Sequence, residues 1–159
     1  MPATAATTPS PLAKREDAII RRALSILESR QRAVGVQLDS PQSVRAFLRL
    51  KLADSDREQF GVLFLDAQNH LLSFEILFVG TLAQTAVYPR EVAKRALALG
   101  AQGVILSHNH PSGVCEPSQG DEYLTQSLKA TLKMLDVVVL DHIVVSRVGS
   151  VSMAERGLV

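Results

Sequence analysis

Apolar positions along the chain follow two spacings, one typical of helices and one of strands. Helical spacing predicts helices over residues 12–32, 41–53, 89–100 and 119–135. Continuous apolar runs bounded by turn residues predict strands over 61–66, 71–80, 103–107, 137–146 and 148–153, the first two as a hairpin. This order of elements predicts an α/β (α+β) fold in which helices flank a curved, mixed sheet.

The N-terminal region differs from the rest of the chain. Residues 1–10 are small and rich in Thr and Pro, which predicts a disordered tail. Residues 11–35 predict an amphipathic helix that starts at Pro11 after a capping Ser10. Its arginines, including Arg21 and Arg22, favour a solvated face; contact with phosphate or with a partner is the alternative. Residues 36–159 then form one domain.

Composition narrows the class of protein. The chain has 159 residues, 47% of them hydrophobic, which is ordinary for one globular domain. Lys and Arg number 17 against 16 Asp and Glu, and the aromatic residues are five Phe, two Tyr and no Trp. Neither a basic stripe nor a base-stacking platform is therefore favoured. A single cysteine, Cys115, excludes an intramolecular disulfide and a zinc site with several thiolates.

Targeting signals are also missing from the sequence. Residues 1–11 lack the basic and apolar regions of a signal peptide, and no run approaches the roughly 18 apolar residues of a membrane span. We therefore expect a cytoplasmic protein without a membrane partner.

Candidate chemistry is concentrated after the strand predicted over 103–107. His108 and His110 are separated by one residue, so on extended chain both imidazoles point to the same side. Asp121 follows in the first turn of the next predicted helix, where a loop can aim its carboxylate at the pair. Two imidazole nitrogens and one carboxylate oxygen make a three-ligand zinc set with a fourth position open for water. Water bound there reaches a pKa of about 7 and becomes a usable nucleophile.

Two structural interpretations compete with a metal site. Ser118 precedes Asp121 by three residues, which also indicates a helix-capping pair. His108 and His110 would then be no more than a polar turn after a buried strand. Cys115 is interpreted as an ordinary loop thiol, since a fourth protein ligand would close the open position. His142 is either a hydrogen-bonded strand histidine or a support for one of the ligands.

The spacing of His108, His110, Ser118 and Asp121 resembles the JAMM signature of the JAB/MPN metalloprotease family. Flanking motifs resemble its RadC-like branch over residues 36–159. These motifs are EQFG at 58–61, LFLDAQNHLL at 63–72, GTL at 80–82, YPREV at 88–92, HNHPSG at 108–113 and LDHI at 140–143. The resemblance implies a cytidine-deaminase-like curved sheet and a zinc-dependent hydrolase with one Zn²⁺ per chain.

The resemblance also implies roles for individual residues. His108, His110 and Asp121 match the family's zinc ligands, and Ser118 matches a serine that donates to the oxyanion. An upstream glutamate acts as general base in the family. Glu58 is favoured, because it opens the first strand and matches a Glu-x-x-Gly context. Glu91 in a first helical turn and Glu75, expected to face solvent mid-hairpin, are the alternatives.

Longer RadC-like proteins carry an N-terminal helix-hairpin-helix region, and this chain is interpreted as a short form without it. The favoured function is a zinc metallopeptidase that cleaves a peptide or isopeptide bond in a protein or peptide substrate. The alternatives are a nucleic-acid-associated accessory protein with a structural zinc and an MPN protein-interaction module. A homo-oligomer formed through the hairpin edge or the N-terminal helix is a further expectation.

Overall fold

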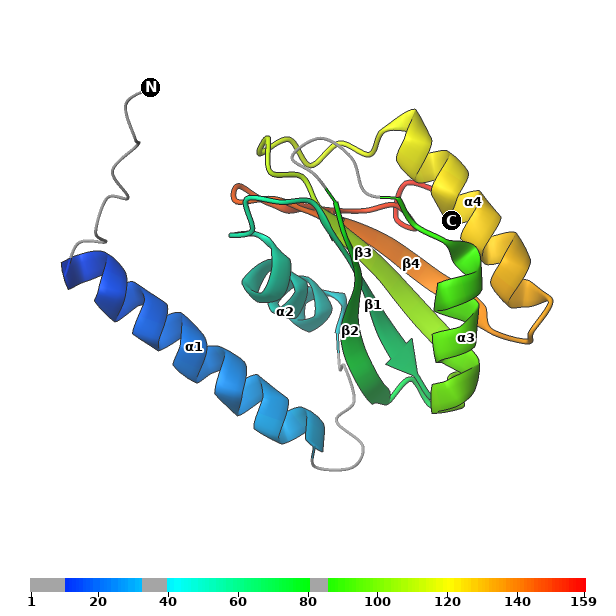
Figure 1. Ribbon diagram of the computed structural model, residues 1–159, viewed down its shortest axis with the longest axis horizontal. Coiled ribbons are helices and arrows are strands. Elements are labelled where there is room, and N and C mark those ends of the chain that lie inside the picture. The colour runs from blue at the N-terminus through cyan, green and yellow to red at the C-terminus, as the bar shows by residue number, and fades with distance from the viewer. Residues whose placement is uncertain (1–10, 33–39, 81–85) are drawn as a thin grey trace, which may run out of the picture.

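One five-stranded sheet organises the molecule, and helices lie on both of its faces (Figure 1). The computed structural model describes residues 11–32, 40–80 and 86–159. Its helices are α1 (Pro11–Arg32), α2 (Pro41–Leu52), α3 (Pro89–Leu99) and α4 (Gln119–Lys133). Its strands are β1 (Gln59–Leu65), β2 (Leu71–Val79), β3 (Gly103–Asn109), β4 (Val138–Val145) and β5 (Ser150–Ser152). The predicted α+β class is confirmed; the predicted tail over 1–10 and the end of the helix predicted to 35 lie outside the described residues.

The sheet is mixed, with strand order β2-β1-β3-β4-β5. Among the described strands, only β3 and β4 run parallel, and α4 connects them, as a parallel pair requires. The prediction ended β3 at 107, but the strand continues to Asn109 because His108 and Asn109 pair with Val144 and Val145 of β4. The end of β3 that carries His108 is therefore held inside the sheet.

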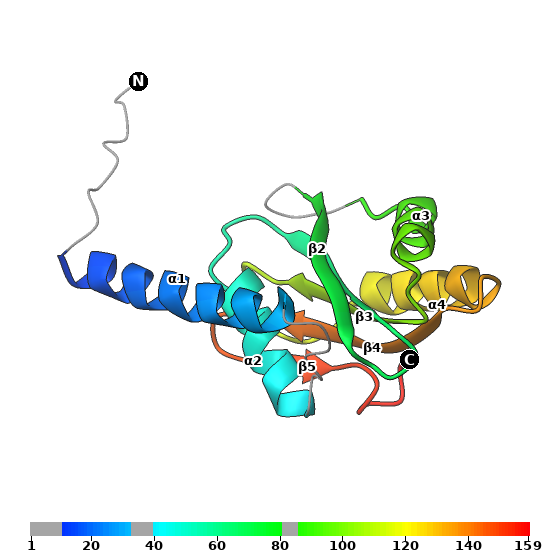
Figure 2. The same ribbon diagram turned by 90° about the horizontal axis from the view of Figure 1, so that it is seen from below.

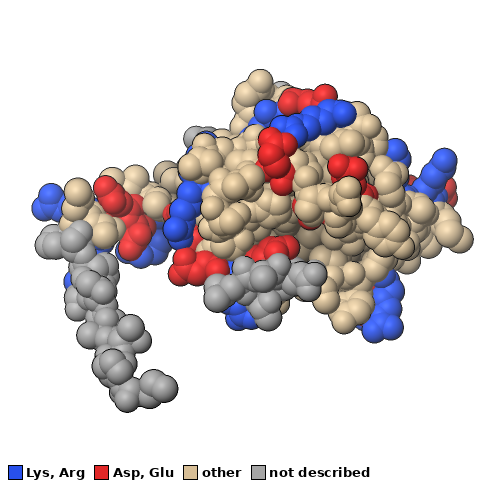
Figure 3. Space-filling view, turned by 90° about the horizontal axis from the view of Figure 1, so that it is seen from above, with Lys and Arg blue, Asp and Glu red and all other residues tan. Residues whose placement is uncertain are grey.

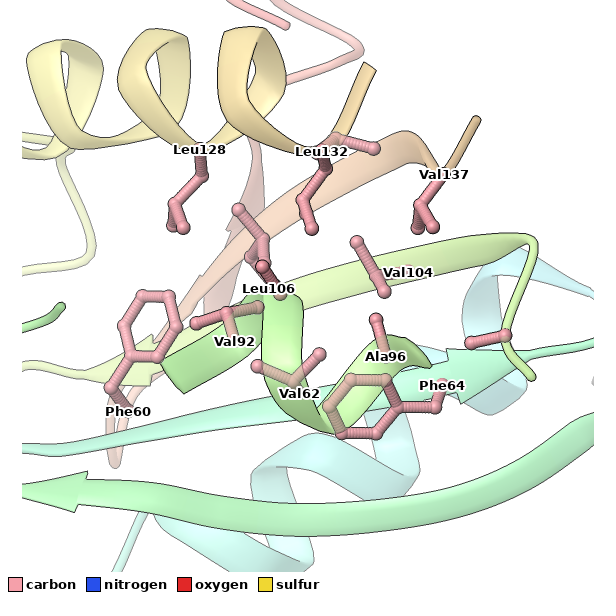
Figure 4. Packing of buried hydrophobic residues seen from close by; sticks show 13 residues of the cluster. Phe60, Val62, Phe64, Val92, Ala96, Val104, Leu106, Leu128, Leu132 and Val137 are labelled. Atoms are coloured by element: carbon pink, nitrogen blue, oxygen red, sulfur yellow. The ribbon is translucent and has the colours of Figure 1, made fainter. Parts of the chain in front are cut away.

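Side chains that alternate along the strands contribute to two hydrophobic cores, one on each face of the sheet. On one face α3 and α4 cover a cluster that includes Phe60, Leu106 and Leu128. Figure 4 shows Leu128 and Leu132 reaching from α4 toward Leu106. On the other face α2 covers a second cluster around Leu48 and Leu63. Burying both faces fixes the register of the sheet, since a slip by one residue would exchange its two faces.

Local sequence signals set the helix ends. Ser40 caps α2 by accepting a hydrogen bond from the backbone N–H of Ser43 at 3.2 Å. Gly100 ends α3 in the left-handed conformation (φ 65°), which glycine adopts without strain. Both ends agree with the sequence prediction, because capping chemistry acts within a few residues.

Helix α1 crosses α2 near its C-terminal end and contacts α2 and β2 there, and the rest of the helix extends beyond the molecule (Figure 2). Leu27 packs against the α2-side core, whereas Ile19 is 69% exposed, so the apolar stripe is only partly buried. Among the described residues, no helix has the length and apolar composition needed to cross a membrane. Figure 3 shows Lys and Arg interspersed with Asp and Glu over the face in view.

Candidate metal centre

The end of β3 carries two histidines toward the helix-α4 side of the sheet. His108 lies within the strand and is 2% exposed; His110 follows directly after it. The two Nε2 atoms are 2.9 Å apart. The His108 ring stacks against Phe60, with centroids 6.4 Å apart and planes 12° from parallel. Packing and strand pairing therefore hold the two imidazoles with their Nε2 atoms converging.

Helix α4 begins at the same place and supplies a carboxylate. Ser118 and Asp121 form a capping box: Ser118 Oγ accepts from the Asp121 backbone N–H at 3.1 Å, and Asp121 Oδ2 accepts from the Ser118 backbone N–H at 2.7 Å. The same carboxylate faces the histidines, with Oδ1 3.1 Å from His108 Nε2 and Oδ2 3.5 Å from His110 Nε2. A helix cap and a metal site are therefore compatible, because the Asp121 side chain caps α4 and faces the histidines at the same time.

His108, His110 and Asp121 form a group whose ligand atoms all lie within 4.8 Å of one another. Two imidazole nitrogens and a carboxylate oxygen suit zinc and leave a coordination position for water. The orientation of His110 fits this role, because its Nδ1 lies 2.8 Å from the carbonyl oxygen of Val114. A carbonyl only accepts, so Nδ1 carries the hydrogen and the neutral ring keeps a lone pair on Nε2.

The charges in this group are coupled. Burial alone would raise the pKa of Asp121, but the adjacent imidazoles of His108 and His110 outweigh it and lower that pKa well below its usual range. The Asp121 carboxylate in turn raises the pKa of His110. Desolvation lowers the pKa of the fully buried His142. The site therefore keeps its carboxylate ionised beside the convergent nitrogens, an arrangement that suits a metal cation.

Glu58 lies next to this group through the pairing of β1 with β3. Phe60 is opposite His108 in the antiparallel register, and Glu58 precedes Phe60 by two residues, so Glu58 lies at the end of β1 nearest the two histidines. The charge of Glu58 contributes to the raised pKa of His110. The carbonyl of Glu58 accepts a 2.8 Å hydrogen bond from the Gly80 N–H, which ties the start of β1 to the end of β2.

The other two glutamates have different surroundings. Glu75 does not simply face solvent, as the sequence predicted: Arg95 donates to both of its oxygens at 2.6 Å, and this pairing lowers its pKa. Glu91 lies in the first turn of α3, with Lys94 Nζ at 3.4 Å from its Oε2. Both carboxylates have structural partners on α3.

Two further polar groups at the site were not assigned roles from the sequence. Asn109, between the histidines, is 1% exposed and bonds to the backbone on both sides of Glu58. Thr125, also fully buried, contacts His142. The one sequence signal for Asn109 was its place between two histidines, whereas Thr125 looked like any other residue of a helix. Cys115 lies in the loop and contacts Ser146, with Sγ and Oγ 2.8 Å apart.

Comparison with known proteins finds relatives over the part of the chain that contains this site. A family model described as RadC-like JAB domain matches residues 38–158. A UPF0758 protein of Leptothrix cholodnii is 61% identical over 140 residues, which cover 84% of this chain and 63% of that protein. A UPF0758 protein of Methylibium petroleiphilum is 58% identical over 140 residues with the same coverage. A UPF0758 protein of a Polaromonas species is 52% identical over 141 residues, 85% of this chain and 63% of the relative. The chain thus spans 63% of the length of these relatives, whose names state no activity.

Proposed function

The chain belongs to the family of RadC-like JAB domains, and from that premise we propose that it is a zinc-dependent hydrolase of the JAMM type. Its substrates would be proteins or peptides, cleaved at a peptide or isopeptide bond. The observation that carries the proposal is the convergence of two Nε2 atoms and a carboxylate within hydrogen-bonding distance of one another. Lone pairs facing one another at such distances repel unless a cation or a proton lies between them.

His108, His110 and Asp121 would hold the zinc. When bound, zinc lowers the pKa of water to about 7 and polarises a substrate carbonyl. Glu58 takes a proton from the attacking water and passes it to the leaving amine. Ser118 Oγ now donates to Asp121 Oδ2 at 2.7 Å; rotation of its hydrogen about the Cβ–Oγ bond lets it donate to the substrate oxygen as negative charge develops.

The contacts of Glu75 and Glu91, the other two candidates, support the choice of Glu58 as general base. A general base needs a carboxylate that can exchange protons near the reacting bond. Glu75 forms an ion pair with Arg95 on α3. Glu91 lies in the first turn of α3 and forms an ion pair with Lys94. Of these three glutamates, Glu58 is the one whose charge contributes to the raised pKa of His110.

The alternative functions have less support in the structure. The interspersed charges on the face seen in Figure 3 do not favour a nucleic-acid-associated accessory protein. A protein-interaction module needs neither three convergent metal-binding groups nor a glutamate whose charge acts on them.

Metal content is the first test. Protein purified without a metal-affinity tag should hold about one equivalent of zinc by elemental mass spectrometry, as a three-ligand site predicts. The double variant His108→Ala/His110→Ala should lose the zinc, whereas His70→Ala, in the turn before β2, should keep it. No zinc in the wild type after growth in zinc-replete medium would overturn the proposal.

Turnover tests the mechanism separately. A peptide library containing both α-amide and Lys ε-amide bonds, analysed by mass spectrometry, offers both bond types in many sequence contexts, so the assay does not depend on one chosen substrate. Glu58→Gln should keep its zinc and lose cleavage, whereas Glu75→Gln should cleave like the wild type. Undiminished cleavage by the Glu58→Gln variant would exclude the mechanism.

A further inference from the structure

A buried series of hydrogen bonds connects His108 to the backbone of Asp121. This relay consists of His108, His142, Thr125 and the carbonyl group of Asp121. His108 Nδ1 lies 2.8 Å from His142 Nε2, and His142 Nδ1 lies 2.6 Å from Thr125 Oγ1. Thr125 Oγ1 lies 2.6 Å from the carbonyl oxygen of Asp121, one turn earlier on α4. Thr125 and His142 are both fully buried, so water does not compete for these contacts.

The direction of every hydrogen bond in this relay follows from its terminal acceptor, the carbonyl oxygen of Asp121. A backbone carbonyl only accepts, so the single hydrogen of the Thr125 hydroxyl goes to Asp121. The contact of His142 with Thr125 then needs a hydrogen on His142 Nδ1. If the hydroxyl hydrogen turned to His142 instead, two oxygens would face each other at 2.6 Å without a hydrogen between them. Met153 Sδ, 3.7 Å from the hydroxyl, is a weaker acceptor.

The same reasoning continues to His108. A buried neutral imidazole carries one hydrogen, so His142 Nε2 is left as an acceptor. His108 Nδ1 is then the donor, and the hydrogen of its neutral ring is on Nδ1 rather than on Nε2. Its Nε2, the atom that faces His110 and Asp121, keeps its lone pair.

We propose that His142 and Thr125 are positioning residues that hold His108 in the tautomer a metal ligand needs. The proposal rests on the metal site of the proposed function. It makes Asp121 act twice, through its carboxylate beside His108 and through its carbonyl at the far end of the relay. His110 reaches the same tautomer more directly, because its Nδ1 donates to the Val114 carbonyl. Thus both imidazoles are oriented by backbone carbonyls, one of them through two intervening side chains.

Imidazole nitrogen NMR reads the tautomer without any activity assay. In ¹⁵N-labelled protein, His142 should carry its hydrogen on Nδ1, with an unprotonated Nε2, in both zinc-free and zinc-loaded samples. A hydrogen on His142 Nε2 would overturn the proposal, since His142 would then donate to His108 Nδ1 and reverse the relay. Because the zinc-free sample is informative alone, a failure of zinc binding would refute the proposed function without deciding this result.

Zinc affinity, measured by competition with a chromophoric chelator, tests the consequence. Thr125→Val removes the hydroxyl at nearly constant shape and should weaken zinc binding roughly 10–100-fold, the usual effect of losing a group that orients a ligand. Thr125→Ser keeps the hydroxyl and should restore most of that affinity. Thr131→Val is the matched control, because Thr131 makes the same bond one turn back, to the Ser127 carbonyl at 2.9 Å, farther along α4.

Each outcome of this comparison between the Thr125 and Thr131 variants supports or overturns the proposal. Wild-type zinc affinity in a folded Thr125→Val variant would overturn the proposal. An equal loss in Thr131→Val would also overturn it, because general weakening of α4 would then explain the effect. If Thr125→Val does not fold, the NMR measurement on the wild type decides the question by itself.

Discussion

Asn109 holds the backbone N–H of Gln59 at 2.7 Å, fifty residues away in the chain, through its side-chain oxygen. Its side-chain nitrogen donates to the Arg57 carbonyl at 3.1 Å. Glu58 lies between those two residues, so one buried amide fixes the backbone on both sides of the proposed base. The orientation of the amide is unambiguous, because an N–H needs an acceptor and a carbonyl needs a donor.

Asn109→Ala should leave that N–H and carbonyl without partners and free the segment that carries Glu58. We expect a loss of about 1–3 kcal/mol in the free energy of unfolding, measured by urea titration. Zinc content should be unchanged while peptide cleavage falls, because the ligands stay in place and the base does not. Cleavage at the wild-type rate in this variant would show that Glu58 needs no such support.

The sequence predicted those features that depend on near neighbours in the chain. The helix starts at Ser40 and Ser118 follow from capping chemistry within three residues, and His108 and His110 share a side because they are two residues apart. The roles of the glutamates, by contrast, came only from a family resemblance and remain proposals.

The contacts of Asn109 and His142 could not be predicted in this way. Asn109 meets the segment around Glu58 only through the register of β1 and β3, and His142 meets His108 through the β3–β4 pairing. A polar residue on a predicted strand gives no sign of its partner dozens of residues away. For the same reason the prediction ended β3 before His108, whose burial depends on both neighbouring strands.

Ser118→Ala should separate the helix-capping role of Ser118 from its proposed role in cleavage. Removing the hydroxyl deletes the bond from the Asp121 N–H and should cost about 0.5–2 kcal/mol in the free energy of unfolding. Ser40→Ala removes the equivalent cap of α2 and should destabilise the protein by a similar amount. Only Ser118→Ala should also reduce cleavage, since Ser40 lies away from the metal centre. Equal cleavage by the two variants would assign Ser118 to capping alone.

Leu128→Ala should weaken the attachment of α4 to the sheet. Leu128 is fully buried and points toward Leu106 (Figure 4), so its truncation should cost about 2–5 kcal/mol in the free energy of unfolding. Leu97→Ala on α3 is the control, because Leu97 is 57% exposed and should change stability by about 0.5 kcal/mol or less. A small effect at Leu128 would contradict the observed packing of α4.

Stability without zinc should fall as the pH rises above 6.5. The folded state raises the pKa of His110 above its ordinary value of 6.5, so folded protein binds a proton there more tightly than unfolded protein. That contribution is fully present below pH 6.5 and is lost as the pH rises through the folded pKa. His142, whose pKa is lowered, acts below pH 6.5, and Asp121, also lowered, acts below its ordinary value of 3.8. The window above pH 6.5 therefore isolates His110 among these three groups.

Urea titrations of zinc-free protein between about pH 6.5 and 8.5 should show the decline in the wild type and a flatter profile in His110→Gln. Saturating zinc should reverse the trend, because the metal competes with the proton on His110 and binds more tightly as that proton leaves. A wild-type profile as flat as that of the variant would mean that His110 and Asp121 do not share a proton in the folded protein. Their convergence would then no longer be evidence for a cation site.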